Sequence, residues 1–244
     1  MYMNLIFLEE TDSTNTYLKQ LCRDGAEHET VVYTYNQLSG YGRHGKYWHS
    51  EKDKSLAMSL LLQPSSICSL PPISIAMGVA VHNVICKITS VRIKWPNDIL
   101  ANFRKICGIS CECMFVDGRA HIILGIGINV NNVSFPGDLA QTATSLKMET
   151  GQEWDVCALM HEISKSVFEY YEMILCGEYP RILKEFKSNC INVGNEVTAF
   201  SKNKKIQGIA VDIDEMGCLI VQTKNGDCEI LSAGEVSLNF LSGE

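Results

Sequence analysis

The residues best suited to chemistry stand near the middle of the chain, in the run Lys94-Trp95-Pro96-Asn97-Asp98. This run combines a cation, an indole, an amide and a carboxylate. Pro96 favours an extended conformation for the residue before it, and Asn97 and Asp98 are typical turn residues, so we expect a strand to end here. Lys94 has apolar neighbours in the sequence, among which an unpaired ammonium is costly, and its partner could be an anionic ligand. For Lys94 taken alone, a side chain that reaches water is the simpler interpretation.

A glycine-rich basic segment at residues 36–48 follows an expected strand and is a second candidate site. Its glycines permit close backbone approach, and they are interspersed with Arg43, His44 and Lys46. Arginine offers a planar fork of donors that suits phosphate or carboxylate. The segment is neither a P-loop nor a dinucleotide fingerprint. It could be a flexible surface loop, but its ending in Tyr47-Trp48 favours a lid that orders over a ligand.

Polar residues open the first expected helix at Thr11-Asp12-Ser13-Thr14-Asn15. They could act only as N-terminal caps, which is the simpler local interpretation, or they could bind a polar or anionic group there. Further along, a turn at residues 102–104 predicts a hairpin that brings Lys94 and Lys105 to one site. Two lysines without a carboxylate between them would attract an anion. The segment 125–131 continues another strand and contains two glycines, which permit close packing beside a ligand.

The elements that must position these residues follow from the periodicity of the apolar side chains. We expect strands at residues 4–9, 30–35, 55–62, 91–94, 105–115 and 121–124, helices at 12–25, 73–87, 153–176 and 179–188, and loops at 63–72 and 136–146. The composition changes at Asn189. After it, short strands at 197–200, 205–212, 218–223 and 227–232 alternate with tight turns and predict a small barrel. We therefore expect two domains, at residues 1–189 and 190–244.

The composition is that of an ordinary globular protein, with 244 residues of which 46% are hydrophobic and 20% charged. The net charge of -7 repels nucleic acid from the surface as a whole, so any anion site must be a local basic pocket. The 11 cysteines include no Cys-x-x-Cys pair and follow no secretory signal, which favours reduced thiols in a cytoplasmic protein. Cys107, Cys111 and Cys113 share one expected strand face with Ile109, which indicates core residues rather than metal ligands. The longest apolar run, at residues 73–86, is too short to span a bilayer.

In order and spacing, these motifs resemble those of the biotin protein ligase family over nearly the whole chain. The matching motifs are Ser13-Thr14-Asn15, Gln37-x-x-Gly40-x-Gly42-Arg43-x-Gly45-Lys46-x-Trp48, Lys94-Trp95-Pro96-Asn97-Asp98, Lys105-Ile106-Cys107-Gly108-Ile109 and Gly125-Ile126-Gly127-Ile128-Asn129-Val130. Residues 207–237 are similar to the family's C-terminal SH3-like domain. Tyr41, His44 and Lys46 stand where well-known members of the family carry arginines.

The resemblance implies an α+β fold: a mixed central sheet with helices packed on one side, similar to class II aminoacyl-tRNA synthetases, precedes a small SH3-like β-barrel. It also implies a reaction in two steps. Biotin and ATP form biotinyl-5′-AMP and pyrophosphate, and a specific lysine of a biotin carboxyl carrier protein domain then takes the biotinyl group. ATP and Mg²⁺ are the implied cofactors, with Mg²⁺ held through the ATP phosphates and no metal ligand assigned in the chain. The winged-helix domain of repressor-type members is not expected here, so we expect a cytoplasmic monomer or homodimer without nucleic-acid or membrane partners.

The resemblance assigns site residues by the positions that match its motifs. The residues expected to bind biotin are Ser13, Thr14, Asn15, Gln37, Gly40, Gly42, Lys105 and Gly108, and those expected to bind ATP or the adenylate are Arg43, Lys46, Trp48, Lys94, Trp95, Asn97, Gly127 and Asn129. Lys105 would contact both the biotin carboxylate and the phosphate, with Arg43, Lys94 and Asp98 as further catalytic residues. Asp98 would either hold a polar group or activate the incoming lysine as a base. The alternatives are a lipoate or octanoate ligase or transferase of the same architecture, and a catalytically inactive biotin sensor.

Overall fold

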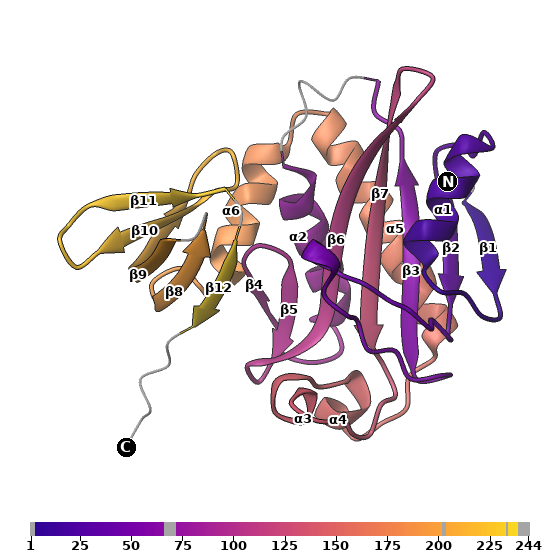
Figure 1. The fold of residues 1–244 in the computed structure, drawn as a ribbon, viewed down its shortest axis with the longest axis horizontal. Helices are drawn as coiled ribbons and strands as arrows, with labels where there is room; N and C mark the ends of the chain where they lie inside the picture. Colours follow the sequence, from indigo (N-terminus) through magenta and orange to yellow (C-terminus); the bar gives the residue numbers. More distant parts are fainter. Residues whose placement is uncertain (1–2, 66–71, 202–203, 233, 239–244) are drawn as a thin grey trace.

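The computed structural model describes residues 3–65, 72–201, 204–232 and 234–238 of the chain. It contains a large sheet flanked by helices and a smaller sheet built from the C-terminal residues (Figure 1). Most of the predicted loop at residues 63–72 lies outside the described residues. Within the described parts of the chain, we find no helix with both the length and the apolar character that crossing a lipid bilayer requires.

The large sheet is mixed, and its seven strands follow the order β1-β2-β3-β7-β6-β5-β4. These strands are β1 (Asn4–Leu8), β2 (Thr30–Thr34), β3 (Ser55–Leu62), β4 (Arg92–Lys94), β5 (Asp98–Ala101), β6 (Arg104–Val116) and β7 (Arg119–Asn129). The first two pair in parallel, whereas the other neighbouring strands pair antiparallel. The predicted strands are all present, because the alternation of apolar residues is a direct signal for strands buried on one or both faces.

β5 is the strand of this sheet that the sequence analysis does not predict. The expected turn at Asn97 and Asp98 is wrong for its second residue, because Asp98 begins β5. In the sheet, Asp98 pairs with Lys94 on one side and with Gly108 on the other. The hairpin predicted around residues 102–104 is confirmed and joins β5 to β6. A strand of four residues is too short to show a periodic pattern.

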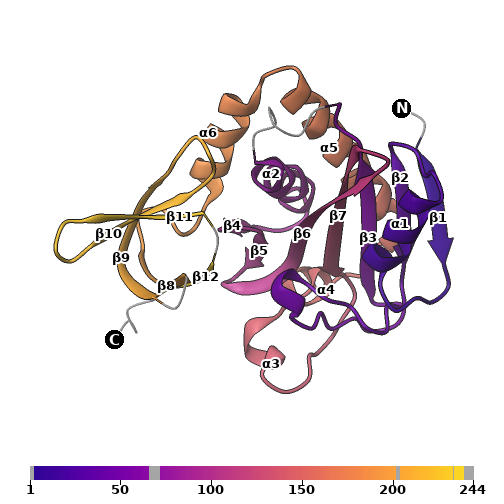
Figure 2. The same ribbon diagram turned by 45° about the horizontal axis from the view of Figure 1, so that its top comes forward.

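Helices cover both faces of the large sheet (Figures 1 and 2). On one face, α2 (Ile73–Ile85), α5 (Val156–Leu175) and α6 (Tyr179–Asn189) pack in the main hydrophobic core. On the other face, α1 (Thr14–Arg23) contributes Leu18 and Cys22 to a second cluster with Val32, Leu61 and Ile123. Successive strand residues point to opposite faces, so these three strand residues belong to the face opposite the main core. The expectation that the helices pack on one side is therefore wrong for α1.

The prediction of a loop at residues 136–146 is also partly wrong, because this segment contains α3 (Leu139–Thr142) and leads into α4 (Leu146–Thr150). The hydroxyl of Ser145 accepts a hydrogen bond from the backbone N–H of Met148 and caps α4. The polar, small residues of this segment carry little apolar periodicity, which is why the two short helices escape prediction.

The prediction that the cysteines of β6 are core residues is confirmed in part. Cys107 and Ile109 are buried in the main core, but Cys111 and Cys113 are exposed. β6 pairs with β5 only as far as Gly108, so the rest of the strand has a neighbour on one side only. Periodicity assigns a residue to a face, but it does not tell how far the cover over that face extends.

The C-terminal sheet is antiparallel, with five strands in the order β11-β10-β9-β8-β12. The strands are β8 (Glu196–Ser201), β9 (Lys204–Ile213), β10 (Leu219–Thr223), β11 (Cys228–Leu231) and β12 (Glu235–Leu238). The four predicted strands are present, and β12 is an additional one. Within the described residues, β11 and β12 are the two edges, so the sheet is open.

Trp95 joins the two sheets. Its side chain is 1% exposed, and its indole N–H donates a 2.9 Å hydrogen bond to the carbonyl of Gly217 in the turn between β9 and β10. Its backbone N–H donates to Asn192 Oδ1 at 2.7 Å. The backbone N–H of Ile191 donates to the carbonyl of Ile93 at 2.8 Å. The turn that follows β4 is therefore tied to the C-terminal sheet and to the segment that leads into it.

Candidate active site

Over two adjacent rows of residues, three neighbouring strands present only small side chains on the face that carries α1. In register across β3, β7 and β6, Ser59, Gly125 and Ser110 form one row, and Ala57, Gly127 and Gly108 form the next. We call these six residues the small-residue floor. Their neighbours along the strands, such as Met58, Ile109 and Ile126, are buried in the main core on the opposite face. Above the floor lies a cavity of about 230 Å³, which we call the first cavity.

The N-terminal end of α1 forms a polar wall of the first cavity. The backbone N–H and the hydroxyl of Thr14 donate to Gln37 Oε1 at 3.0 and 3.3 Å. The buried amide of Asn15 donates to Ser110 Oγ at 3.3 Å, and Ser59 donates to Asn15 Oδ1 at 2.5 Å. Ser13 caps the helix, as its N-cap geometry indicates. The capping interpretation is therefore confirmed for Ser13, and the same segment also lines the cavity.

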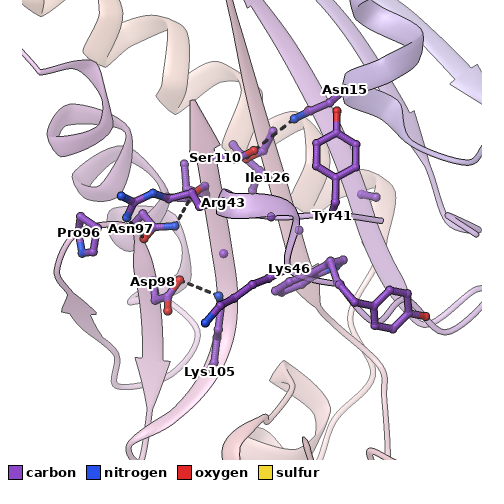
Figure 3. A pocket seen from close by; sticks show the side chains of 18 of the residues that line it. Asn15, Tyr41, Arg43, Lys46, Pro96, Asn97, Asp98, Lys105, Ser110 and Ile126 are labelled. Atoms are coloured by element: carbon purple, nitrogen blue, oxygen red, sulfur yellow. Dashed lines mark hydrogen bonds and ion pairs between the residues drawn. The ribbon is translucent and has the colours of Figure 1, made fainter. Parts of the chain in front are cut away.

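Cations line the opposite wall of the first cavity, where they come from three separate segments. Figure 3 shows Arg43, from the short helix η1 (Arg43–Gly45), beside Asn97, and Lys105 beside Asp98. Arg43 Nη1 donates to Asn97 Oδ1 at 3.1 Å. Lys46 and Lys94 line the same cavity. The convergence of basic side chains in a chain of net charge -7 is therefore confirmed as a local pocket.

The expectation that no carboxylate lies between the two lysines is wrong. Lys105 Nζ lies 2.7 Å from Asp98 Oδ1, and both side chains are partly exposed. Asp98 has this place because β5 lies between β4 and β6, so that its carboxylate stands between the strands of Lys94 and Lys105. Lys105 is consequently held by a partner that an incoming anionic ligand would have to replace.

Trp48 and Lys105 stand at the boundary between the first cavity and a second cavity of about 410 Å³. A Cβ atom at Gly127 would lie 2.4 Å from the indole of Trp48, and one at Gly108 would lie 3.1 Å from it, so the ring rests on the floor. Lys105 Nζ lies 5.4 Å from the centroid of the Trp48 ring, within the range of a cation–π contact. The second cavity continues past Asn129, whose amide donates to the carbonyl of Thr144 at 3.0 Å.

Most of the residues predicted for the site are brought together. The first cavity is lined by Ser13, Thr14, Asn15, Gln37, Gly42, Arg43, Lys46, Trp48, Lys94, Trp95, Asn97, Asp98, Lys105, Gly108 and Gly127. Asn129 lines the second cavity instead. Gly40 lines neither, but a Cβ atom there would lie 2.4 Å from Gln37 Nε2, so this glycine gives Gln37 its place. Trp95 contributes to the cavity boundary, while its buried indole is bound to the C-terminal sheet.

Sequence reasoning missed a polar cluster beside this wall. Lys19 Nζ lies 2.6 Å from Glu112 Oε2 and 3.3 Å from the hydroxyl of Tyr41, and Asn15 donates to Glu112 Oε1 at 2.7 Å. Burial alone would lower the pKa of Lys19, but the hydrogen bonds to Glu112 and Tyr41 raise it above its ordinary value. The period of two from Gly108 through Ser110 to Glu112 was the available signal. Glu112 lies more than 90 residues from both Lys19 and Asn15 in the chain, and no local pattern predicts such a pairing.

The chemistry of these donors suits a ligand with an acid group and a phosphate. Fixed cations in a partly enclosed pocket stabilise negative charge better than water does. Among the described residues, no group of three or more His, Cys, Asp or Glu side chains could hold a metal ion.

Comparison with known proteins gives the same result from the sequence and from the fold. Residues 7–129 match the model of the biotin/lipoate A/B protein ligase family, and residues 193–239 match the biotin protein ligase C-terminal domain. The chain is 32% identical over 239 residues to the bifunctional ligase/repressor BirA of Bacillus spizizenii, covering 96% of this chain and 74% of that protein. It is 26% identical over 238 residues to the biotin–[acetyl-CoA-carboxylase] ligase of Paracoccus denitrificans, covering 94% and 98%.

Among solved structures, the biotin protein ligase from Aquifex aeolicus in complex with biotin and ATP has a TM-score of 0.86 to this chain. The two are 29% identical, and the match covers 98% of this chain and 99% of the other. The resemblance that the motifs indicated is therefore confirmed along almost the whole length of the molecule. With a matching family model, a relative above 30% identity and a shared fold, the chain belongs to the biotin/lipoate A/B protein ligase family.

Proposed function

We propose that this chain is a biotin protein ligase, which activates biotin with ATP and transfers it to a lysine of a biotin carboxyl carrier domain. The observation that carries the proposal is the position of Lys105 at the boundary of two cavities, one with a wall of uncharged polar side chains and one leading to Asn129. The Aquifex aeolicus relative is described as a complex with biotin and ATP. The Paracoccus denitrificans relative is named for acetyl-CoA carboxylase, which supports a carboxylase carrier domain as the acceptor.

Biotin occupies the first cavity in this proposal. Its ureido ring presents two N–H donors and one carbonyl acceptor, which Ser13, Thr14 and Gln37 can match. The small-residue floor leaves room for a fused ring system, because no side chain longer than that of serine rises from it. Asn15 and Gly108 complete the surroundings, and Gly42 allows the basic segment to approach closely. A concave site with few convergent polar groups is the usual form of a small-molecule pocket.

The nucleotide occupies the second cavity, which Asn129 lines, with Trp48 and the underlying Gly127 at the boundary with the first cavity. Arg43, Lys46 and Lys94 neutralise the phosphates. Mg²⁺ would be held through the ATP phosphates rather than by ligands of the chain, and would supply polarisation of the phosphoryl oxygens. Asn97 fixes Arg43 by accepting its hydrogen bond, and the Asn97 amide is itself fixed by donating to the carbonyl of Ile109 at 2.6 Å.

In the first step, a carboxylate oxygen of biotin attacks the α-phosphorus of ATP. The bond from that phosphorus to the bridging oxygen breaks, and pyrophosphate leaves. Lys105 stabilises the charge that develops on the reacting oxygens, which is the role in which a fixed cation contributes most. To do so it exchanges its Asp98 partner for the substrate. In the second step, the amine of the acceptor lysine attacks the carbonyl carbon, the bond to the phosphate oxygen breaks, and AMP leaves. Asp98, released from Lys105, accepts the proton that the amine gives up.

Finer features of the molecule belong to the same proposal. Residues 1–189 form the catalytic domain, and residues 190–244 form a C-terminal domain that we infer to be an SH3-like barrel. The match of residues 193–239 to a biotin protein ligase C-terminal domain supports this division and disfavours a lipoate or octanoate ligase. We further propose a cytoplasmic enzyme that acts as a monomer or homodimer and has no nucleic-acid or membrane partner.

The proposal is tested by incubating the purified chain with ATP, Mg²⁺, radiolabelled biotin and a carrier domain. We expect label on one lysine of the carrier, with release of AMP and pyrophosphate. Lipoate and octanoate are assayed in parallel, and a carrier domain with its target lysine replaced by alanine is the control. Preferential transfer of lipoate or octanoate would identify the alternative ligase. Absence of AMP and pyrophosphate with every acid would leave a binding protein without catalysis.

Replacing Arg43 with glycine is expected to make the site release biotinyl-AMP. The variant loses the 3.1 Å hydrogen bond between Arg43 and Asn97, which ties η1 to the turn after β4. A hydrogen bond made by a charged group contributes enough free energy for an increase in the release rate of about tenfold. The measurement is the rate at which preformed adenylate leaves the protein. The Arg181→Ala variant, which breaks an exposed ion pair with Glu178, is the control. Equal release rates for Arg43→Gly and the unaltered chain would contradict the prediction.

A further inference from the structure

The turn between β5 and β6 has a residue that its backbone geometry disfavours. Asn102 and Phe103 form a two-residue hairpin loop, flanked by the paired Ala101 and Arg104, and both have positive φ values, 45° and 62°. Such loops favour asparagine followed by glycine. Asn102 fits this preference. Phe103 does not, because a bulky side chain in the left-handed region is strained.

The exposure of Phe103 to solvent is a second unfavourable feature of this residue. Its side chain is large and apolar, yet the residue is 61% exposed. A smaller or polar residue would avoid both disadvantages without any change to the hairpin. An aromatic residue that is strained and largely exposed is a candidate for a role in ligand binding.

The surrounding structure holds this turn in place. Glu149 of α4, whose side chain is 4% exposed, accepts a 2.6 Å hydrogen bond from the amide of Asn102 and a 2.8 Å hydrogen bond from Arg104 Nη2. The hydroxyl of Thr144 donates to the same carboxylate. One buried carboxylate thus fixes the residues on both sides of Phe103. The fold therefore defines the position of the turn that carries the ring.

Held by these hydrogen bonds to Glu149, Phe103 lines the second cavity. The turn is close in sequence to Lys105, which stands where the two cavities meet. Phe135 and Leu139 line the same cavity and give it an apolar part, while Asn129 supplies an amide. A flat, partly apolar group with hydrogen-bonding edges matches this combination, and the purine base of ATP is such a group.

We propose that Phe103 is a nucleotide-binding residue of this chain, whose ring packs against the purine base of ATP in the second cavity. The inference rests on the function proposed above and assigns a contact to a residue outside all of the matched motifs. Every base has a π-face, and stacking against an aromatic side chain is strong enough to change affinity about tenfold. The strain of the turn is then tolerated because the ring contributes to substrate binding.

The decisive variant is Phe103→Gly, which gives the turn its preferred residue and removes the ring. Glycine has no steric penalty at positive φ, so we expect a thermal midpoint no lower than that of the unaltered chain. In the biotin-dependent ATP–pyrophosphate exchange reaction, the KM for ATP should rise about tenfold. The KM values for biotin and for pyrophosphate, which has no base, should stay the same. Phe103→Tyr keeps the ring and should keep the KM for ATP within about twofold.

Phe115→Ala is the matched control, because Phe115 is another exposed phenylalanine, at 63%, and lines neither cavity. It should leave all three KM values unchanged. An unchanged KM for ATP in Phe103→Gly would overturn the inference. Equal rises for ATP and pyrophosphate would also overturn it, since the ring would then act on the phosphate end through Lys105. Failure of the unaltered chain to catalyse the exchange at all would instead reject the proposed function, so the two results are distinguishable.

Discussion

Replacement of Lys105 by alanine is expected to abolish adenylate formation and leave the fold intact. The variant removes a cation that borders both cavities, as Lys94 also does, and that lies 2.7 Å from Asp98. Loss of a preorganised group that stabilises transition-state charge costs a factor of about 10³ in rate. The ion pair is partly exposed, and such pairs contribute at most about 1 kcal/mol to stability. Biotin-dependent ATP–pyrophosphate exchange measures the first effect, and thermal unfolding measures the second.

A control for this variant exists elsewhere in the chain. Lys147 forms an ion pair of 2.6 Å with Glu153, similar in length to that of Lys105, but lines neither cavity. Lys147→Ala should therefore keep the exchange rate. If Lys105→Ala exchanged pyrophosphate at nearly the rate of the unaltered chain, the role given to Lys105 in the first step would be wrong.

Replacement of Trp95 by alanine should produce the largest loss of stability. Trp95 is among the largest fully buried side chains of the protein, and truncating a buried tryptophan to alanine costs about 3–5 kcal/mol in the free energy of unfolding. The carbonyl of Gly217 would also lose the indole N–H that binds it at 2.9 Å. Unfolding in urea, followed by circular dichroism, gives the free energy directly.

The Trp95→Phe variant separates packing from the hydrogen bond. Phenylalanine retains most of the buried surface but has no donor for Gly217, so we expect a loss of about 1 kcal/mol. Trp154→Phe is the comparison, because the Trp154 indole donates at 3.0 Å to Thr150, a partner only four residues away in the chain. Stability of both Trp95 variants equal to that of the unaltered chain would show that the link between the sheets is energetically neutral.

The sequence predicts those parts of the fold whose signal is local. The long strands β3, β6 and β7 and the helices α2 and α5 each carry an apolar run or an apolar alternation over at least eight residues, which is enough to indicate the element. β5, α3 and β12 have four residues each and show no period. The side on which α1 packs depends on which strand face remains uncovered, and that follows from the assembled sheet alone.

The same distinction applies to the site. Motifs with unusual residues in fixed spacing, such as the run at 94–98, identify their members without a structure. The partner of each member is a matter of tertiary geometry: Asp98 reaches Lys105 because β5 lies between β4 and β6. Trp95 is the instructive case. Pro96 predicts the strand end correctly, but nothing local indicates that the indole turns towards the C-terminal sheet.

The alternation of the small-residue floor with large core residues has a consequence for how this enzyme can change. Residues such as Gly125 and Gly127 set the room above the sheet, and their neighbours Leu124 and Ile126 set the packing beneath it. The room for a ligand and the packing of the core thus depend on alternating positions of the same strands. Substitutions at one set can therefore change ligand binding without changing the residues that form the core. A descendant could fill the floor with methyl groups, remain folded and stop accepting substrate. Among family members with this fold, the size of the side chains at these six positions should therefore distinguish active ligases from inactive ones.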